Sequence, residues 1–342
     1  MSGAPLAIVS TGLVTAVGLS APASCAAIRA GIANPSETRF TDSDGEWIMA
    51  QQVAVGKRWQ GRMRLARMGA MAAVEALAGV PREEWARTPI LLCVAEPDRP
   101  GRLEGLDESL LATLAEMLGT QPARGSGVVA RGRVGVAVAL AHARSLIHER
   151  GCAKVLILAV DSLLGWRTLG HYEANRRLLT PRNSDGFLPG EGAGALLVAA
   201  SAEGAAMHCT GIGFSLEDAR VDSDQPLRAE GLSQAIRAAL AEAGCAMHDI
   251  DYRIADLSGE QYYFKEATLA LARLLRRVKP EFDLWHPAEC IGEAGAVVGA
   301  AAVGVACAAD AKAYAKGPAV LVHLSNDDGA RAAFTLVGGA AR

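Results

Sequence analysis

Four residues near the start of an apolar stretch carry side chains suited to nucleophilic chemistry. His286, Glu289, Cys290 and Glu293 follow one another closely along the chain. A cysteine near a helix N-terminus has a lowered thiol pKa, and a histidine that contacts the thiol can take its proton. The segment therefore predicts either a nucleophilic Cys290 assisted by His286 or a small cysteine packed in a turn.

The remaining histidines and cysteines form no pattern that is typical of a metal or cofactor site. The seven cysteines include no CxxC pair and have no zinc-like spacing with the histidines. There is no P-loop, and no GxGxxG follows the first predicted strand. His171 is either a pocket residue or a surface or dimer contact, and His142 and His148 belong to a buried helix. We therefore expect no cofactor and no metal.

Composition and charge are ordinary for a packed protein of the cytoplasm. Of 342 residues, 51% are hydrophobic and 21% are charged, with a net charge of −3. No basic stripe suggests nucleic acid, and the chain start lacks the basic and apolar regions of a signal peptide. The uncharged stretch Ala294–Ala309 is too short to cross a membrane. We expect a cytoplasmic protein that binds neither nucleic acid nor membranes.

Strand and helix patterns alternate along the chain, which favours an α/β fold. The predicted strands are Leu6–Gly12, Ile90–Ala95, Val155–Val160, Ala193–Ala199, Tyr252–Leu257 and Ala319–Leu324. The predicted helices are Ala21–Ala30, Leu65–Ala78, Glu108–Leu118, Val134–Arg150, Ser233–Ala243 and Glu266–Arg277.

Two helical stretches lack a clear polar face. Val134–His148 and Ala294–Ala309 are rich in Ala, Val and Gly around most of their circumference, as in helices buried on several sides. One lies in each half of the chain. This pattern suggests a duplicated unit with helices between two sheets. Because no low-complexity linker separates the halves, we expect one compact body.

Several segments resemble the β-ketoacyl synthases of the thiolase superfamily. The most specific is Asp185–Val198, which reads DGFLPGEGAGALLV and is similar to the DGFxxGEGAGxLVL segment of that family. Ile8–Gly18 with Ile28–Gly31 resembles the N-terminal strand, loop and first helix, and Gly151–Asp161 resembles the GDADVMVAGG strand. The resemblance covers most of the chain and is weaker in the second half.

The resemblance implies a fold, a boundary and partners. The fold is a thiolase-like five-layer αβαβα sandwich of two pseudo-repeated halves, here residues 1–204 and 205–342. Members of the family dimerise through a strand next to the first buried helix, which implies a homodimer. An acyl carrier protein or another protein is a possible further partner.

The resemblance also places a catalytic cysteine at the start of the first buried helix, and that cysteine is missing. Aligned back from Gly151, the helix begins near Arg133. The guanidinium of an arginine stays protonated and cannot accept an acyl group. The nearest thiol in sequence, Cys152, follows the far end of the same helix.

The two family histidines have no counterpart either. The segment comparable to NAHGTxT is Ala255–Gln261, where Ser258 takes the histidine position and Glu266 follows as the helix acid. The segment comparable to GHxxGAAG places Gly292, or Glu293 after a shift of one residue, at the second histidine.

The gate motif GFGGxN compares with Leu324–Arg331, which carries Asp327 and Asp328 instead of glycine or aromatic residues. Removing a nucleophile alone costs on the order of 10⁶ in turnover. The replacements together predict loss of the Claisen condensation.

Arg133 is expected to plug the former pocket. Both buried helices would direct positively polarised N-termini at it, so the guanidinium needs a carboxylate partner. The matching loops of the other half supply Asp256, Glu260, Glu289 and Glu293.

Two functions follow from this site. The first is a non-catalytic scaffold, adaptor or accessory subunit, since degenerate ketosynthase relatives serve as partner subunits in polyketide assembly. The chain also resembles thiolase-like proteins found beside type VI secretion effectors. The second is an acyltransferase, thioesterase or decarboxylase that acts on acyl carrier protein or coenzyme A thioesters through a rearranged site.

Overall fold

The computed structural model describes residues 3–56, 59–202 and 205–338, and in them the strands form one large sheet and a hairpin. The sheet contains β1 (Leu6–Val14), β4 (Ile90–Val94), β5 (Gly127–Ala130), β6 (Lys154–Ser162), β7 (Glu191–Ala199), β8 (Met207–Leu216), β9 (Tyr252–Ala255), β10 (Leu284–Trp285), β11 (Ala319–Ser325) and β12 (Ala330–Gly338). The hairpin pairs β2 (Ser36–Thr41) with β3 (Trp47–Ala50).

The helices connect these strands and cover their faces. They are α1 (Ala21–Arg29), α2 (Gly61–Ala76), α3 (Arg82–Trp85), α4 (Leu110–Met117), α5 (Gly135–His148), α6 (Trp166–Ala174), α7 (Glu230–Ala243), α8 (Gln261–Leu274), α9 (Ala288–Ile291) and α10 (Val298–Ala311). Short 3₁₀ turns are η1 (Gly132–Val134), η2 (Met247–Asp249) and η3 (Gly295–Val297).

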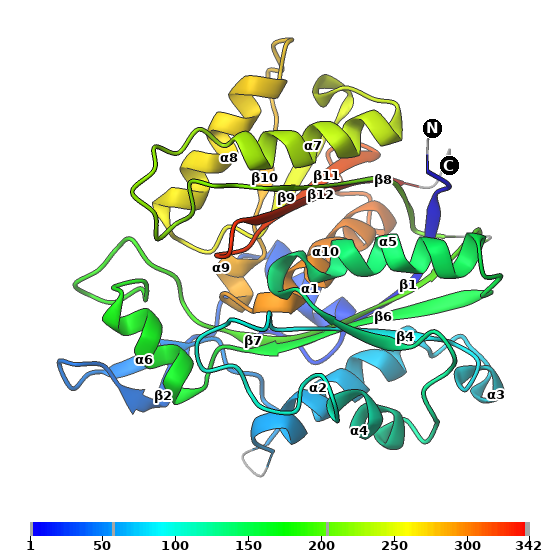
Figure 1. The fold of residues 1–342 in the computed structure, drawn as a ribbon, viewed down its shortest axis with the longest axis horizontal. Helices are drawn as coiled ribbons and strands as arrows, with labels where there is room; N and C mark the ends of the chain where they lie inside the picture. Colours follow the sequence, from blue (N-terminus) through cyan, green and yellow to red (C-terminus); the bar gives the residue numbers. More distant parts are fainter. Residues whose placement is uncertain (1–2, 57–58, 203–204, 339–342) are drawn as a thin grey trace.

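The elements stack in the five layers that the sequence predicts. Figure 1 shows α7 and α8 outside the strands of the second half, α5 and α10 between the two groups of strands, and α2 and α4 outside the strands of the first half. The strand order is β10-β9-β11-β12-β8-β1-β7-β6-β4-β5, so both groups belong to one continuous sheet instead of two separate ones. The junction exists because β1 pairs with both groups: Leu6–Ile8 pair with Met207–Cys209 of β8, and Ala7–Val14 pair with β7.

Small residues allow the two central helices to approach each other and the sheet. A Cβ added at Gly299 of α10 would lie 2.8 Å from the Val136 Cβ of α5, and one added at Gly194 of β7 would lie 2.6 Å from the Ala300 Cβ. Any side chain at Gly299 or Gly194 would thus collide with its neighbour, so the glycines allow the close packing that fills the interior. Among the described residues, no helix is both long and apolar enough to span a membrane.

Several elements were not predicted from the sequence. β8 contains Gly211 and Gly213, and β12 is rich in alanine, so neither shows the bulky alternating pattern of a strand. The glycines of β8 are needed because a Cβ on either would lie 2.1 Å from a backbone oxygen of α7. The expected boundary between the halves, after residue 204, falls at residues 203–204, outside the described residues.

Replacing Gly213 by alanine tests the close contact between β8 and α7. The added methyl group would meet the Ala235 carbonyl oxygen, so we expect Gly213→Ala to lower the free energy of unfolding by about 2–3 kcal/mol. Gly170→Ala is the control, because its Cβ meets nothing within 4 Å in α6 and should be neutral or stabilising. Urea unfolding measures both, and equal values would contradict the packing described.

Candidate functional site

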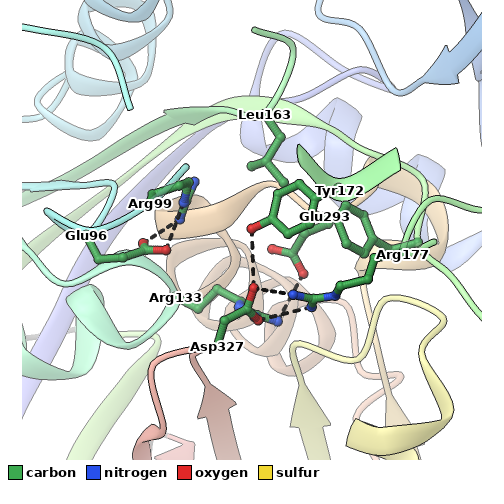
Figure 2. Close-up of a pocket in the computed structure, with 9 residues that line it drawn as sticks. Glu96, Arg99, Arg133, Leu163, Tyr172, Arg177, Glu293 and Asp327 are labelled. Atoms are coloured by element: carbon green, nitrogen blue, oxygen red, sulfur yellow. Dashed lines mark hydrogen bonds and ion pairs between the residues drawn. The ribbon is translucent and has the colours of Figure 1, made fainter. Parts of the chain in front are cut away.

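Arg133 lies in the 3₁₀ turn that precedes the first buried helix, and its side chain is almost fully buried. Its Nη1 is 3.4 Å from the Glu293 Oε2, and its Nη2 forms an ion pair with Asp327. Nη2 also donates to the Tyr263 hydroxyl at 3.1 Å, and the guanidinium lies 4.9 Å from the centre of that ring. Figure 2 shows Arg133 directed at Asp327 and Glu293.

Glu293 joins Arg133 to the start of the second buried helix. Its Oε1 accepts the Gly295 N–H at 3.0 Å, in the 3₁₀ turn that leads into α10, and its Oε2 accepts the Ser258 hydroxyl at 3.0 Å. A carboxylate at this point complements the positive end of the helix. The structure thus brings Arg133, Ser258 and Glu293 together.

Gly292 contributes backbone geometry instead of a side chain. Its φ is +73°, and a Cβ there would lie 2.9 Å from the Leu188 carbonyl oxygen. Glycine adopts this conformation at little cost, whereas other residues are strained in it. The side chain that enters the site from this segment is therefore that of Glu293, the residue that follows.

Asp327 binds two arginines at the turn between β11 and β12. Besides Arg133, it accepts Arg177 Nη1 at 2.7 Å and the Tyr172 hydroxyl at 3.3 Å. Burial opposes ionisation of Asp327, but Arg133 and Arg177 together hold its pKa well below the usual range. The sequence marked Asp327 as an altered gate position without identifying it as a partner of Arg133.

Of the four carboxylates among which the partner of Arg133 is expected, Glu293 forms the ion pair, whereas Glu260 and Glu289 bind other residues. Glu260 accepts two bonds from Arg177, at 2.6 and 2.8 Å, because it points toward the loop that follows α6. Glu289 is largely exposed on the short helix α9, and its Oε1 lies 3.1 Å from the His286 Nδ1.

Cys290 is a buried thiol that faces the backbone. Its Sγ lies 4.0 Å from the Ile28 carbonyl oxygen, while the nearby His286 contacts Glu289 and the Phe264 ring. Burial and the charge of Glu289 raise the pKa of the thiol. These surroundings favour the packed-turn interpretation of Cys290 over the nucleophilic one.

Another buried arginine, Arg99, pairs with two carboxylates beside the same site and was not identified from the sequence. Arg99 binds Glu96 at 2.9 and 2.6 Å and Asp161 at 2.8 Å. Asp161, the last residue of the matched GDADVMVAGG-like strand, in turn accepts the Ala296 N–H at 2.8 Å. Asp161 and Glu293 therefore both satisfy amide groups at the start of the second buried helix.

Asp256 adds a buried carboxylate that has no short ion pair of its own. Its Oδ2 accepts the Ser325 N–H at 2.7 Å. Burial raises the pKa of Asp256 to about 7, although the nearby Arg133 favours the charged form. Burial likewise raises the pKa of Glu293, against the effect of Arg133. Asp256 is therefore partly protonated near neutral pH.

The space among these side chains is nearly filled. A cavity of about 10 Å³ remains, which is room for about one water molecule. It is lined by Glu96, Arg99, Arg133, Leu163, Tyr172, Arg177, Phe187, Glu293 and Asp327. A site of this size and charge does not accommodate an acyl chain.

Two curated proteins from Streptomyces are similar in sequence to part of the chain. A polyketide beta-ketoacyl synthase 2 of Streptomyces cyaneus is 33% identical over 199 residues, which cover 54% of this chain and 46% of that protein. A protein of the same name from Streptomyces halstedii is 35% identical over 184 residues, 49% of this chain and 44% of that protein. The matched region thus spans less than half the length of these relatives. No family model matches the chain.

Solved structures share the whole fold at low identity. A type II polyketide synthase ketosynthase, in complex with its acyl carrier protein and bound to a hexaketide, has a TM-score of 0.81 at 16% identity and covers 98% of this chain and 100% of its own. The ishigamide ketosynthase/chain length factor has a TM-score of 0.76 at 19% identity, and the match covers 98% of this chain and 99% of that chain. A ketosynthase in complex with its chain length factor from Xenorhabdus doucetiae has a TM-score of 0.70 at 13% identity, and the match covers 98% of each chain. The chain therefore has the fold of these ketosynthase structures, in agreement with the thiolase-like sandwich expected from the sequence.

Removing Arg133 tests whether its charge holds the site together. Arg133→Leu leaves the buried Glu293 without a cation and Asp327 with Arg177 alone, so we expect the free energy of unfolding to fall by about 3–5 kcal/mol. Arg220→Ala, which removes an exposed ion pair with Asp222, should change it by less than about 1 kcal/mol. Similar small losses in both variants, measured by urea unfolding, would contradict the account.

The ionisation of Asp256 predicts a dependence of stability on pH. Its folded-state pKa of about 7 exceeds the value of about 4 in an unfolded chain, so the folded state binds more protons between these values. This group's contribution to stability therefore falls as pH rises from about 4 to 7.

Asp256→Asn removes that ionisation and keeps an oxygen to accept the Ser325 N–H. The stability of the variant relative to the wild type should rise by up to about 4 kcal/mol between pH 4 and pH 8. Unfolding curves at several pH values measure the difference, and carboxylates that do not interact with Asp256 cancel in the comparison. Parallel pH profiles for the two proteins would show that Asp256 ionises normally.

Proposed function

We propose that this protein is a non-catalytic ketosynthase-like subunit that has lost the Claisen condensation and acts by binding a partner. The observation that carries the proposal is Arg133, which stands where the resemblance places the nucleophilic cysteine. Its guanidinium is buried and bound to Glu293 and Asp327. An arginine held in this way cannot form a thioester or an ester.

The rest of the site supports the same proposal. Ser258 and Glu293 bond to each other at 3.0 Å in the segments where the resemblance expects two histidines. Neither can act as the neutral imidazole that hydrogen-bonds a thioester oxygen or takes up a proton near pH 7. The remaining cavity of about 10 Å³ leaves no space for a substrate chain.

The kind of partner is suggested by the relatives of known structure. Two of them are ketosynthases with chain length factors, and a third is a ketosynthase with its acyl carrier protein. We therefore favour another ketosynthase-like chain as the partner over a homodimer, and over an adaptor role beside a type VI secretion effector, which none of these relatives represents.

β5 offers the edge for such a pairing. It is the last strand of the sheet and pairs on one side only, with β4. An unpaired strand edge is a template for a strand of another chain. The short side chains of Gly127–Ala130, two of them valines, leave room for the backbone of a second strand at this edge.

The alternative function is residual acyl transfer, hydrolysis or decarboxylation. It requires a nucleophile, which Arg133 cannot supply. Cys290 is the candidate, and burial and Glu289 raise the pKa of its thiol, so little thiolate is present at neutral pH. This observation favours the non-catalytic function.

Intact-mass measurement after incubation with acetyl- and malonyl-thioesters separates the two functions. We expect no acyl adduct on the wild-type protein and no release of carbon dioxide from the malonyl thioester. An authentic ketosynthase treated in parallel confirms that the thioesters are competent. A stable adduct that disappears in Cys290→Ser would contradict the proposal and establish the rearranged site.

A further inference from the structure

One part of the molecule lies beside the five layers and has a small core of its own. It consists of the β2–β3 hairpin, α6 and residues 175–187, and Figure 1 shows α6 and β2 together at one side of the sandwich. Its apolar residues Phe40, Ile48, Leu169, Tyr172, Leu178 and Phe187 form, with Leu163 of the segment before α6, a cluster separate from those of the layers. The parts of this unit are also joined to each other, since Arg182 binds Asp44 at 2.7 Å.

Few polar contacts fasten this unit to the second half of the chain, and Arg177 makes most of them. Its Nε and Nη2 donate to Glu260 at 2.6 and 2.8 Å, and its Nη1 binds Asp327 at 2.7 Å. Two single bonds accompany it, from the Gln261 N–H to Asp185 at 2.7 Å and from the Tyr172 hydroxyl to Asp327. A bidentate fork in which donor and acceptor are both charged is stronger than a single bond in which only the carboxylate is charged.

The same unit covers the closed site. Tyr172, Arg177 and Phe187 of this unit line the small cavity together with Arg133, Glu293 and Asp327 of the body. Figure 2 shows the Tyr172 hydroxyl and the Arg177 guanidinium directed at the Asp327 carboxylate. Displacement of residues 166–187 would therefore expose the buried charges to solvent while the five layers stay folded.

We propose that residues 166–187, together with the β2–β3 hairpin, form a lid over the former active site, and that Arg177 is the ionic latch that keeps it shut. A unit with a small separate core opens at lower free energy than the body of the protein. The latch is bound to Glu260 and Asp327, which both belong to the body, so its loss removes the main polar attachment of the lid to the second half of the chain. The Thr168 hydroxyl, which donates to the Pro100 carbonyl oxygen at 2.9 Å, still holds α6 to the first half. This inference goes beyond the proposed function and holds whether or not the site retains chemistry.

Hydrogen–deuterium exchange of the full-length protein tests the lid. In Arg177→Ala, amides of residues 166–187 should exchange at least about tenfold faster than in the wild type, since charged bonds worth more than about 1.4 kcal/mol are lost. Amides of β7 and α10 should keep their wild-type rates. Arg182→Ala is the matched control, because it removes an exposed ion pair inside the lid and should leave the exchange of residues 166–187 unchanged.

Two further variants keep the test decisive if Arg177→Ala folds poorly. Glu260→Gln weakens the same latch from the body side and should accelerate the same amides. Arg177→Lys retains a charge without the fork and should give an intermediate rate. Unchanged exchange in the lid would overturn the proposal, because Arg177 would then not hold the lid closed. An acceleration spread equally over β7 and α10 would also overturn it, because the lid would then not open independently of the body.

Discussion

A buried arginine at the start of α5 requires negative charge around it, and that requirement shapes the site. Moving a guanidinium out of water is costly unless carboxylates and hydrogen bonds replace its hydration. Arg133 meets this need with Glu293 and Asp327, which come from two different segments of the second half. The ion pairs of this one side chain therefore hold the segment before α5 against the segments that carry Glu293 and Asp327.

The ends of the buried helices extend this arrangement. The first turn before α10 offers the N–H groups of Gly295 and Ala296, which Glu293 and Asp161 accept. Each of these carboxylates is also held by an arginine, Arg133 or Arg99. Helix ends that would activate a thiolate in a catalytic site thus stabilise carboxylates here. These paired charges, together with the apolar side chains of Leu163 and Phe187, nearly close the cavity.

The fold was predictable because its signals are local. The Ala-, Val- and Gly-rich runs around Val136 and Ala300 identify the central helices, and the Asp185–Val198 segment identifies the fold family. The absence of a cysteine near Arg133 is likewise readable from the sequence. β8 escaped prediction because the close approach of α7 selects glycine where a strand usually carries bulky residues, and β12 because it is rich in alanine.

The site was only partly predictable because its partners are distant in the chain. Arg133 and Asp327 lie 194 positions apart, and Arg177 and Glu260 lie 83 apart, so no periodicity relates them. Glu289 and Glu293 are neighbours in sequence, yet only Glu293 turns inward, because α9 points Glu289 at solvent. The direction of a side chain at the end of a short helix depends on tertiary contacts that the sequence pattern does not encode.

The central claim is that Arg133 and its carboxylates occupy the space that an acyl substrate would need. A crystal structure determined in the presence of a saturating long-chain acyl thioester tests it most directly. The account predicts that Arg133 stays bound to Glu293 and Asp327, with no acyl chain between the two halves. Density for an acyl chain in that space, with the Arg133 guanidinium displaced toward solvent, would contradict it.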